Sequence, residues 1–158
     1  MLILPFVTAI VLAAADQLLK KIAEANLVSG TPVKVITAGD TDILTFSLYR
    51  NTGAAFSSFE GKTVFLIIVT SVMMIALAVW LIKSKPKKLL PVICIAAVLG
   101  GGIGNLIDRI FLGYVVDYII LFPFTFIFNF ADICVVVGAI ILGIYFFFFE
   151  GKTEEKHE

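Results

Sequence analysis

The chain has 158 residues, of which 60% are hydrophobic and 15% charged, and its mean hydropathy is +1.07. Soluble domains usually carry about 25% charged residues, so this composition indicates an integral membrane protein long enough for one helical bundle. The formal net charge of +0 gives no basic footprint for nucleic acid, and one histidine with two cysteines argues against a zinc site.

The first apolar run, residues 1–15, is shorter than the about 20 residues that cross a bilayer. One interpretation is a secretory signal peptide that is cleaved after three alanines, but no basic residues precede the apolar part. The other is a transmembrane helix over about 2–25 that continues through Asp16 and Lys20. These two residues are four positions apart, so they share a helix face and can pair. We favour the helix, with the pair pointing into the bundle.

The segment at about 28–60 is the only long polar one. Residues 33–37 and 43–50 are rich in β-branched and aromatic side chains, and AGDTD between them is a turn signal. We predict a small β-sheet lying on the membrane surface. It leads into NTGAAF at 51–56, where Asn51 and Gly53 are also typical of an ordinary turn.

Two apolar segments, at 63–82 and 89–108, predict the second and third transmembrane helices. The third contains GGGIG, which does not fit the GxGxxG nucleotide template, and small residues in a membrane helix favour close helix packing. Asn105, Asp108 and Arg109 follow on one face. They form either a polar helix end with an internal ion pair or part of a functional site.

The next stretch, up to residue 126, is apolar but broken by glycine and proline, so we predict an amphipathic or re-entrant segment at the membrane interface. Phenylalanine then occupies every second position from 122 to 130, which indicates an extended approach in the aromatic belt. A fourth helix is predicted over 130–149, with Asp132 in its first turn. We expect the charged tail, 150–158, to be disordered.

Lysine density predicts the orientation. Lysine and arginine divide equally between the two sides, but four lysines lie within the short loop KSKPKK at 83–88. Such clusters mark cytoplasmic loops. We therefore expect this loop and both termini in the cytoplasm, and the β-segment near the outer face.

Asp117 and Asp132 lie in apolar sequence near that outer face, and a charge in such surroundings is a functional hypothesis by default. Two adjacent carboxyl groups share one proton, because like charges a few Å apart do not both ionise. The ionised member can activate water while the protonated member polarises a scissile carbonyl. A purely structural role, in caps or ion pairs, is the alternative.

Five motifs occur in order along the whole chain: DQLLK (16–20), NTGAAF (51–56), GGIGNLIDR (101–109), GYVVDY (113–118) and FNFAD (128–132). Through them the sequence resembles signal peptidase II, the bacterial lipoprotein signal peptidases. The resemblance implies that Asp117 and Asp132 are catalytic and that no metal or other cofactor is needed. It also implies that nine residues bind substrate or support the site: Asp16, Lys20, Asn51, Gly53, Asn105, Asp108, Arg109, Asn129 and Ala131. Tyr118 stands where the family usually has phenylalanine.

The resemblance further implies a monomeric membrane aspartic endopeptidase of the bacterial cytoplasmic membrane, surrounded by membrane lipids. Its substrates would be diacylglyceryl-modified prolipoproteins, cleaved just before the lipidated lipobox cysteine. Two alternatives come from other classes. A small proton-coupled transporter would use Asp16, Asp117 and Asp132 as a relay, although no internal repeat is evident. A structural membrane subunit would not need buried carboxylates.

The fold expected is a single α-helical membrane domain over 1–158. It has four transmembrane helices, a small extracytoplasmic β-sheet between the first and second, and an interfacial segment between the third and fourth.

Overall fold

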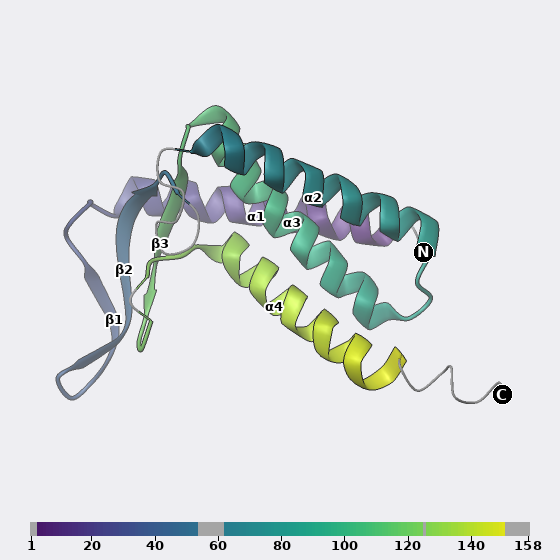
Figure 1. Ribbon diagram of the computed structural model, residues 1–158. Coiled ribbons are helices and arrows are strands. Elements are labelled where there is room, and N and C mark those ends of the chain that lie inside the picture. Colours follow the sequence, from purple (N-terminus) through teal and green to yellow (C-terminus); the bar gives the residue numbers. More distant parts are fainter. Residues whose placement is uncertain (1–2, 54–61, 125, 151–158) are drawn as a thin grey trace.

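The computed structural model describes residues 3–53, 62–124 and 126–150. The helices are α1 (Ile3–Asn26), α2 (Thr63–Ser84), α3 (Leu89–Phe111) and α4 (Phe130–Tyr145), which ends in a π-helical turn, Phe146–Glu150. The strands are β1 (Val33–Ala38), β2 (Thr41–Asn51) and β3 (Val115–Leu121). Figure 1 shows the helices running side by side with the sheet at one end. The start of α1, the α2–α3 connection and the end of α4 lie at the opposite end.

Four helical spans in the described residues are long and apolar enough to cross a membrane: Ile3–Asn26, Thr63–Ser84, Leu89–Phe111 and Phe130–Phe149. This confirms the predicted multi-pass helical fold. The spans differ in burial, since 61% of the most apolar window of α3 is buried but only 11% of the windows of α2 and α4. The third helix is therefore the centre of the bundle, while α2 and α4 present most of their apolar surface outward, as lipid-facing helices do.

The glycines of α3 explain its central position. A Cβ added to Gly100 would come within 3 Å of α1, one on Gly101 would meet the Ala131 carbonyl of α4, and one on Gly102 would meet Met74 of α2. Consecutive helix positions are rotated by about 100°, so three glycines in a row face three different neighbours. The predicted role of this stretch in close helix packing is confirmed.

The sheet has the order β1-β2-β3, and both pairings are antiparallel. Its presence confirms the predicted small sheet, but β3 was not predicted. Within the predicted interfacial segment, Val115–Leu121 forms a strand that pairs with β2, from Asn51↔Val115 to Leu44↔Leu121. Four consecutive residues of β3 are buried, so this strand lacks the polar–apolar alternation that reveals a strand in a sequence.

Two other sequence-based expectations concern the ends of elements. The third helix continues beyond the predicted end at 108 to Phe111, so Arg109 lies within the helix. The alternating phenylalanines lead toward α4 as expected, and Phe128 forms an antiparallel bridge with Ile119 of β3. The tail was expected to be disordered from residue 150, but Glu150 still belongs to the π-helical turn. Residues 151–158 and the last three residues of NTGAAF lie outside the described residues.

Candidate active site

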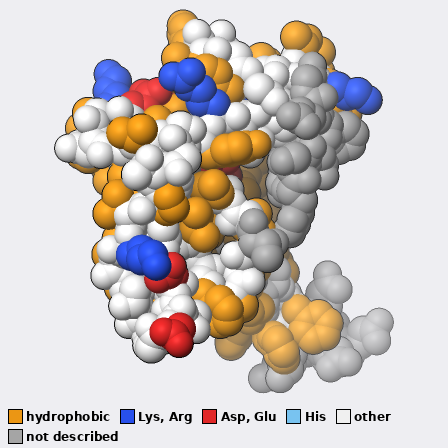
Figure 2. All heavy atoms as spheres, turned by 90° about the vertical axis from the view of Figure 1, so that its left-hand side faces the viewer, with side chains coloured by type: hydrophobic (Ala, Val, Ile, Leu, Met, Phe, Trp, Pro, Cys, Tyr) orange, Lys and Arg blue, Asp and Glu red, His pale blue; other side chains and the backbone are white. Residues whose placement is uncertain are grey.

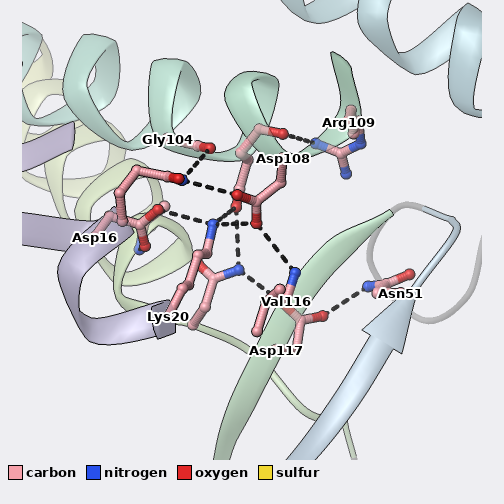
Figure 3. A network of polar contacts seen from close by, with 12 residues as sticks. Asp16, Lys20, Asn51, Gly104, Asp108, Arg109, Val116 and Asp117 are labelled. Carbon is pink, nitrogen blue, oxygen red and sulfur yellow. Dashed lines mark hydrogen bonds and ion pairs between the residues drawn. The ribbon is translucent and has the colours of Figure 1, made fainter. Parts of the chain in front are cut away.

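Polar side chains gather where α1, α3 and α4 meet β3, at the sheet end of the bundle (Figure 3). Asp117 comes from β3 and is 1% exposed, whereas Asp132 comes from the first turn of α4 and is half-buried. Burial of so many polar groups in a largely apolar protein requires that they satisfy one another. The other buried members of this cluster are Asp16, Lys20, Asn105, Asp108 and Asn129.

A capping box fixes Asp132 at the start of α4. The Asn129 side chain accepts a hydrogen bond from the Asp132 backbone N–H at 2.9 Å, and Asp132 Oδ2 accepts one from the Asn129 N–H at 3.2 Å. The local sequence therefore orients this carboxylate by a standard helix-start arrangement. The second oxygen, Oδ1, accepts a hydrogen bond from Asn105 Nδ2 of α3 at 2.8 Å.

Asp117 is held by two amides. Its Oδ1 accepts from Asn129 Nδ2 at 2.6 Å and its Oδ2 from Asn51 Nδ2 at 2.8 Å, while Asn51 Oδ1 accepts from the Gly53 backbone N–H at 2.9 Å. Burial, reinforced by the negative charge of Asp132, raises the pKa of Asp117 to about 7. The same asparagine thus contacts one carboxylate and caps the helix that bears the other.

Lys20 is the centre of the ionic contacts. Its Nζ lies 2.8 Å from Asp16 Oδ2, 2.8 Å from Asp108 Oδ2 and 2.9 Å from Asn105 Oδ1. The predicted pairing of Asp16 with Lys20 is confirmed. The internal ion pair considered for the end of the third helix is not the arrangement found, because Asp108 pairs with Lys20 of α1 rather than with Arg109.

The two carboxylates beside Lys20 also bind backbone groups. Asp16 Oδ1 accepts from the Ala131 N–H at 3.0 Å, and Asp108 Oδ2 accepts from the Val116 N–H at 3.1 Å. Gln17 was missed by the sequence reasoning, although it stands inside DQLLK. Its Nε2 donates to Asp108 Oδ1 at 2.8 Å and to a carbonyl of α3 at 3.1 Å. A long polar side chain in an apolar helix, next to the Asp16–Lys20 pair, was the available signal.

Arg109 connects α3 to the end of β2. Its Nη1 donates to the Asn105 carbonyl at 3.4 Å and its Nη2 to the Gly53 carbonyl at 3.2 Å. Asp132 and Asp117 both lie close enough to interact with its positive charge. Since Gly53 in turn orients Asn51, the guanidinium supports the chain that holds Asp117.

Tyr118 follows Asp117 and is buried, with its ring in edge contact with Phe46 of β2 at a centroid distance of 6.3 Å. Burial and the nearby negative charge of Asp16 raise the pKa of its hydroxyl to about 12. The hydroxyl therefore stays protonated beside the cluster.

Apolar side chains are prominent on the surface at this end of the molecule. Figure 2 views the molecule from the sheet end, where apolar side chains cover the middle of the face and basic and acidic side chains lie toward its edge. An acidic side chain is visible at the bottom of a hollow between the apolar ones. Within residues 3–53, 62–124 and 126–150, His, Cys, Asp and Glu form no group of three or more that could hold a metal ion.

The structure brings both predicted catalytic aspartates and all nine predicted support residues to this one region. Gly53 contributes a carbonyl and an N–H, and Ala131, which is 0% exposed, contributes an N–H. The remaining support residues contribute side chains: Asp16, Lys20, Asn51, Asn105, Asp108, Arg109 and Asn129.

Comparisons with known proteins show the family of this chain. The profile of the family described as Signal peptidase (SPase) II matches residues 8–148. The lipoprotein signal peptidase of Clostridium novyi (strain NT) is 40% identical over 144 residues, which cover 87% of this chain and 92% of that protein. The one from Enterococcus faecalis (strain ATCC 700802 / V583) is 35% identical over 159 residues, covering 98% and 94%.

Two solved bacterial membrane enzyme structures share the fold. One has a TM-score of 0.84 at 30% identity and covers 98% of this chain and 92% of its own, and the other has a TM-score of 0.80 at 31% identity and covers 92% and 93%. Nothing among these similarities supports the transporter alternative. The chain belongs to the signal peptidase II family and is a membrane protease.

Proposed function

We propose that this protein removes signal peptides from prolipoproteins in the bacterial cytoplasmic membrane, cutting just before a lipobox cysteine that carries a diacylglyceryl group. The curated relatives are named lipoprotein signal peptidases. The observation that carries the catalytic assignment is the pair Asp117 and Asp132, which share Asn129 as a neighbour at the sheet end of the bundle.

The two aspartates take different roles in this proposal. Burial and Asp132 raise the pKa of Asp117 to about 7, so below that pH Asp117 is mostly protonated. We assign to Asp132 the removal of a proton from the attacking water. The Asp117 proton polarises the scissile carbonyl as hydroxide adds to its carbon. Collapse of the tetrahedral intermediate breaks the C–N bond, and a carboxyl proton passes to the leaving amine. No metal or nucleophilic side chain takes part.

The hydrogen-bond assignments separate substrate-binding groups from groups that serve the dyad. Asn129 uses both amide hydrogens within the protein, on Asn105 and Asp117. Asn51 donates one amide hydrogen to Asp117. Arg109 donates one hydrogen from each Nη to a backbone carbonyl. Since a guanidinium has five N–H donors, Arg109 is the strongest candidate to bind carbonyls of the extended substrate backbone, which must be satisfied by the protein inside a membrane.

The arrangement of the helices supports the location and the substrate. The dyad lies at the sheet end of the bundle, opposite the α2–α3 connection (Figure 1). Four lysines lie at residues 83–88, one in the last turn of α2 and three in the connection. We therefore place this connection and both termini in the cytoplasm and the dyad near the outer face. The outward apolar surfaces of α2 and α4 would accommodate the acyl chains of substrate and membrane lipids. One chain supplies both aspartates, so a monomer suffices.

The test is cleavage of a synthetic lipobox peptide by purified protein, with and without the diacylglyceryl group on its cysteine. We expect cleavage of the lipidated peptide only, and none by Asp132→Asn. The matched control is Asp42→Asn, since Asp42 is partly exposed on the sheet and pairs with Lys34 at 3.0 Å. Near-normal turnover by Asp132→Asn, or equal cleavage of the unlipidated peptide, would contradict the proposal.

A further inference from the structure

Each aspartate of the dyad follows a residue whose backbone N–H is held by a buried carboxylate. Val116, which precedes Asp117, donates to Asp108 Oδ2 at 3.1 Å. Ala131, which precedes Asp132, donates to Asp16 Oδ1 at 3.0 Å. The two carboxylates belong to different helices, α3 and α1, and hold different elements, β3 and α4.

Lys20 joins these two carboxylates. Its Nζ is 2.8 Å from Asp16 and 2.8 Å from Asp108, and all three side chains are buried. The third contact of Nζ is to Asn105 Oδ1 at 2.9 Å, and this orients the Asn105 amide so that its nitrogen donates to Asp132. Figure 3 shows Lys20 between Asp16 and Asp108, with Val116 and Asp117 on the adjoining strand.

We propose that Lys20 is a positioning residue that sets the separation of the two catalytic carboxyl groups by linking the carboxylates that hold their backbones. We call Asp16, Lys20 and Asp108 the lysine bridge. One arm runs from Lys20 through Asp108 to the strand bearing Asp117; the other runs through Asp16 to the helix bearing Asp132. The inference rests on the proposed function of the dyad.

Physical chemistry favours a geometric role over a stabilising one. A buried ion pair loses much of its Coulomb energy to desolvation, so an apolar set of similar volume is often as stable. The two ion pairs of Lys20 are both 2.8 Å long and buried, so one ammonium group fixes the distance between the two carboxylates. A shared-proton pair needs this precision, because a misplacement of about 1 Å can reduce turnover by roughly 100-fold.

The decisive variant removes the bridge and keeps its charge. Lys20→Met with Asp16→Asn replaces an ammonium and a carboxylate together, so the net charge of the bridge does not change. Asparagine at position 16 can still accept from the Ala131 N–H, and Asp108 keeps its bonds to Val116 and Gln17. Both backbone contacts therefore survive while the link between them is lost.

Charge balance matters because several groups face the dyad from the elements packed around it. In the described part of the chain these are Asp16 and Lys20 from α1, Asp108 and Arg109 from α3, and Tyr118 from β3. The double variant leaves their summed charge unchanged, but Lys20 itself lowers the pKa of Asp117, so loss of its charge alone would raise that pKa. A shift of the profile to lower pH therefore reports geometry. When the carboxyl groups move apart, their mutual repulsion falls, and the second proton leaves the pair at lower pH.

The experiment measures kcat, KM and the pH dependence of kcat for cleavage of the lipidated peptide, at a temperature well below each variant's unfolding midpoint. We expect kcat to fall at least about tenfold with KM within about twofold, and the alkaline limb of the kcat profile to move to lower pH. The control is Lys21→Met, since Lys21 is exposed on the same helix and should behave like the parent.

Parent-like kcat and an unmoved alkaline limb would overturn the inference and leave the bridge as structural support only. If the double variant does not fold, Lys20→Gln with Asp16→Asn replaces it. Glutamine keeps a buried donor but is too short to span both carboxyl groups. The same changes in kcat and in the alkaline limb are then expected, and parent-like values would again overturn the inference. Failure of the proposed function would look different from failure of this inference. In that case the parent enzyme would not cleave the lipidated peptide, or the Asp132→Asn variant would still cleave it.

Discussion

Replacing Asp117 with asparagine tests the proposed chemistry and the electrostatics of the site together. The substitution should abolish cleavage, because asparagine can neither hold nor release the shared proton. Its effect on the free energy of unfolding should also change sign with pH. We expect Asp117→Asn to be more stable than the parent at about pH 8 and less stable at about pH 4.

The alkaline part of this prediction comes from the pKa of Asp117, which burial and Asp132 raise from the ordinary 3.8 to about 7. A carboxyl with a raised pKa binds its proton more tightly in the folded protein. Its contribution to stability is thus fully present below pH 3.8 and is lost as the pH rises through 7. Three pKa units correspond to roughly 4 kcal/mol, which the parent loses and the variant does not.

The acidic part comes from the hydrogen bonds of Asp117. Both of its oxygens accept from amide nitrogens, so an introduced NH₂ group must face a donor on Asn51 or Asn129. Neither amide can turn over freely, because Asn51 Oδ1 is held by Gly53 and Asn129 Oδ1 by Asp132. One unsatisfied donor costs about 1–3 kcal/mol, which is the expected deficit at low pH and leaves a net gain of roughly 1–3 kcal/mol at high pH.

Unfolding of purified parent and variant in the same detergent at about pH 4, 6 and 8 measures both parts, with cleavage assayed on the same preparations. The control is again Asp42→Asn, which should leave the shape of the pH dependence unchanged. If the stability curves of parent and Asp117→Asn run parallel between pH 4 and 8, the buried carboxyl is not neutral in the native protein and the reasoning fails.

Three further predictions concern Arg109, metal dependence and orientation. Arg109→Lys should lose most activity with little change in unfolding midpoint, because lysine lacks the planar fork that reaches two backbone carbonyls. The control is Arg50→Lys, the same change at an exposed arginine stacked on Tyr114, which should cleave like the parent. Equal activity of both variants would remove Arg109 from the site. EDTA should not reduce cleavage, because the proposed chemistry uses only carboxyl groups and water; loss of activity that zinc restores would refute that chemistry. An impermeant thiol reagent on intact cells should label Asp40→Cys and spare Lys85→Cys, since both native cysteines are buried in helices, and the reverse pattern would invert the proposed orientation.

The sequence alone determined the class of protein and most of its helices, because hydropathy and helical periodicity are properties of neighbouring residues. It also indicated Asp117 and Asp132 as candidate catalytic residues, since a carboxylate in an apolar run is conspicuous whatever the fold. The Asp16–Lys20 pair was predictable for the same reason: residues four apart on a helix meet without help from tertiary structure.

Contacts between distant segments depended on the tertiary structure. β3 is a strand only because β2 lies beside it, and its uniform burial removes the alternation that would have revealed it. Asp108 binds Lys20, 88 positions away, because the glycines of α3 let α1 approach closely. Gln17 joins that contact for the same reason. Helical periodicity states which residues share a face, but only the packing of one face on another decides which atoms meet, and the separation of the two carboxyl groups is a property of that packing.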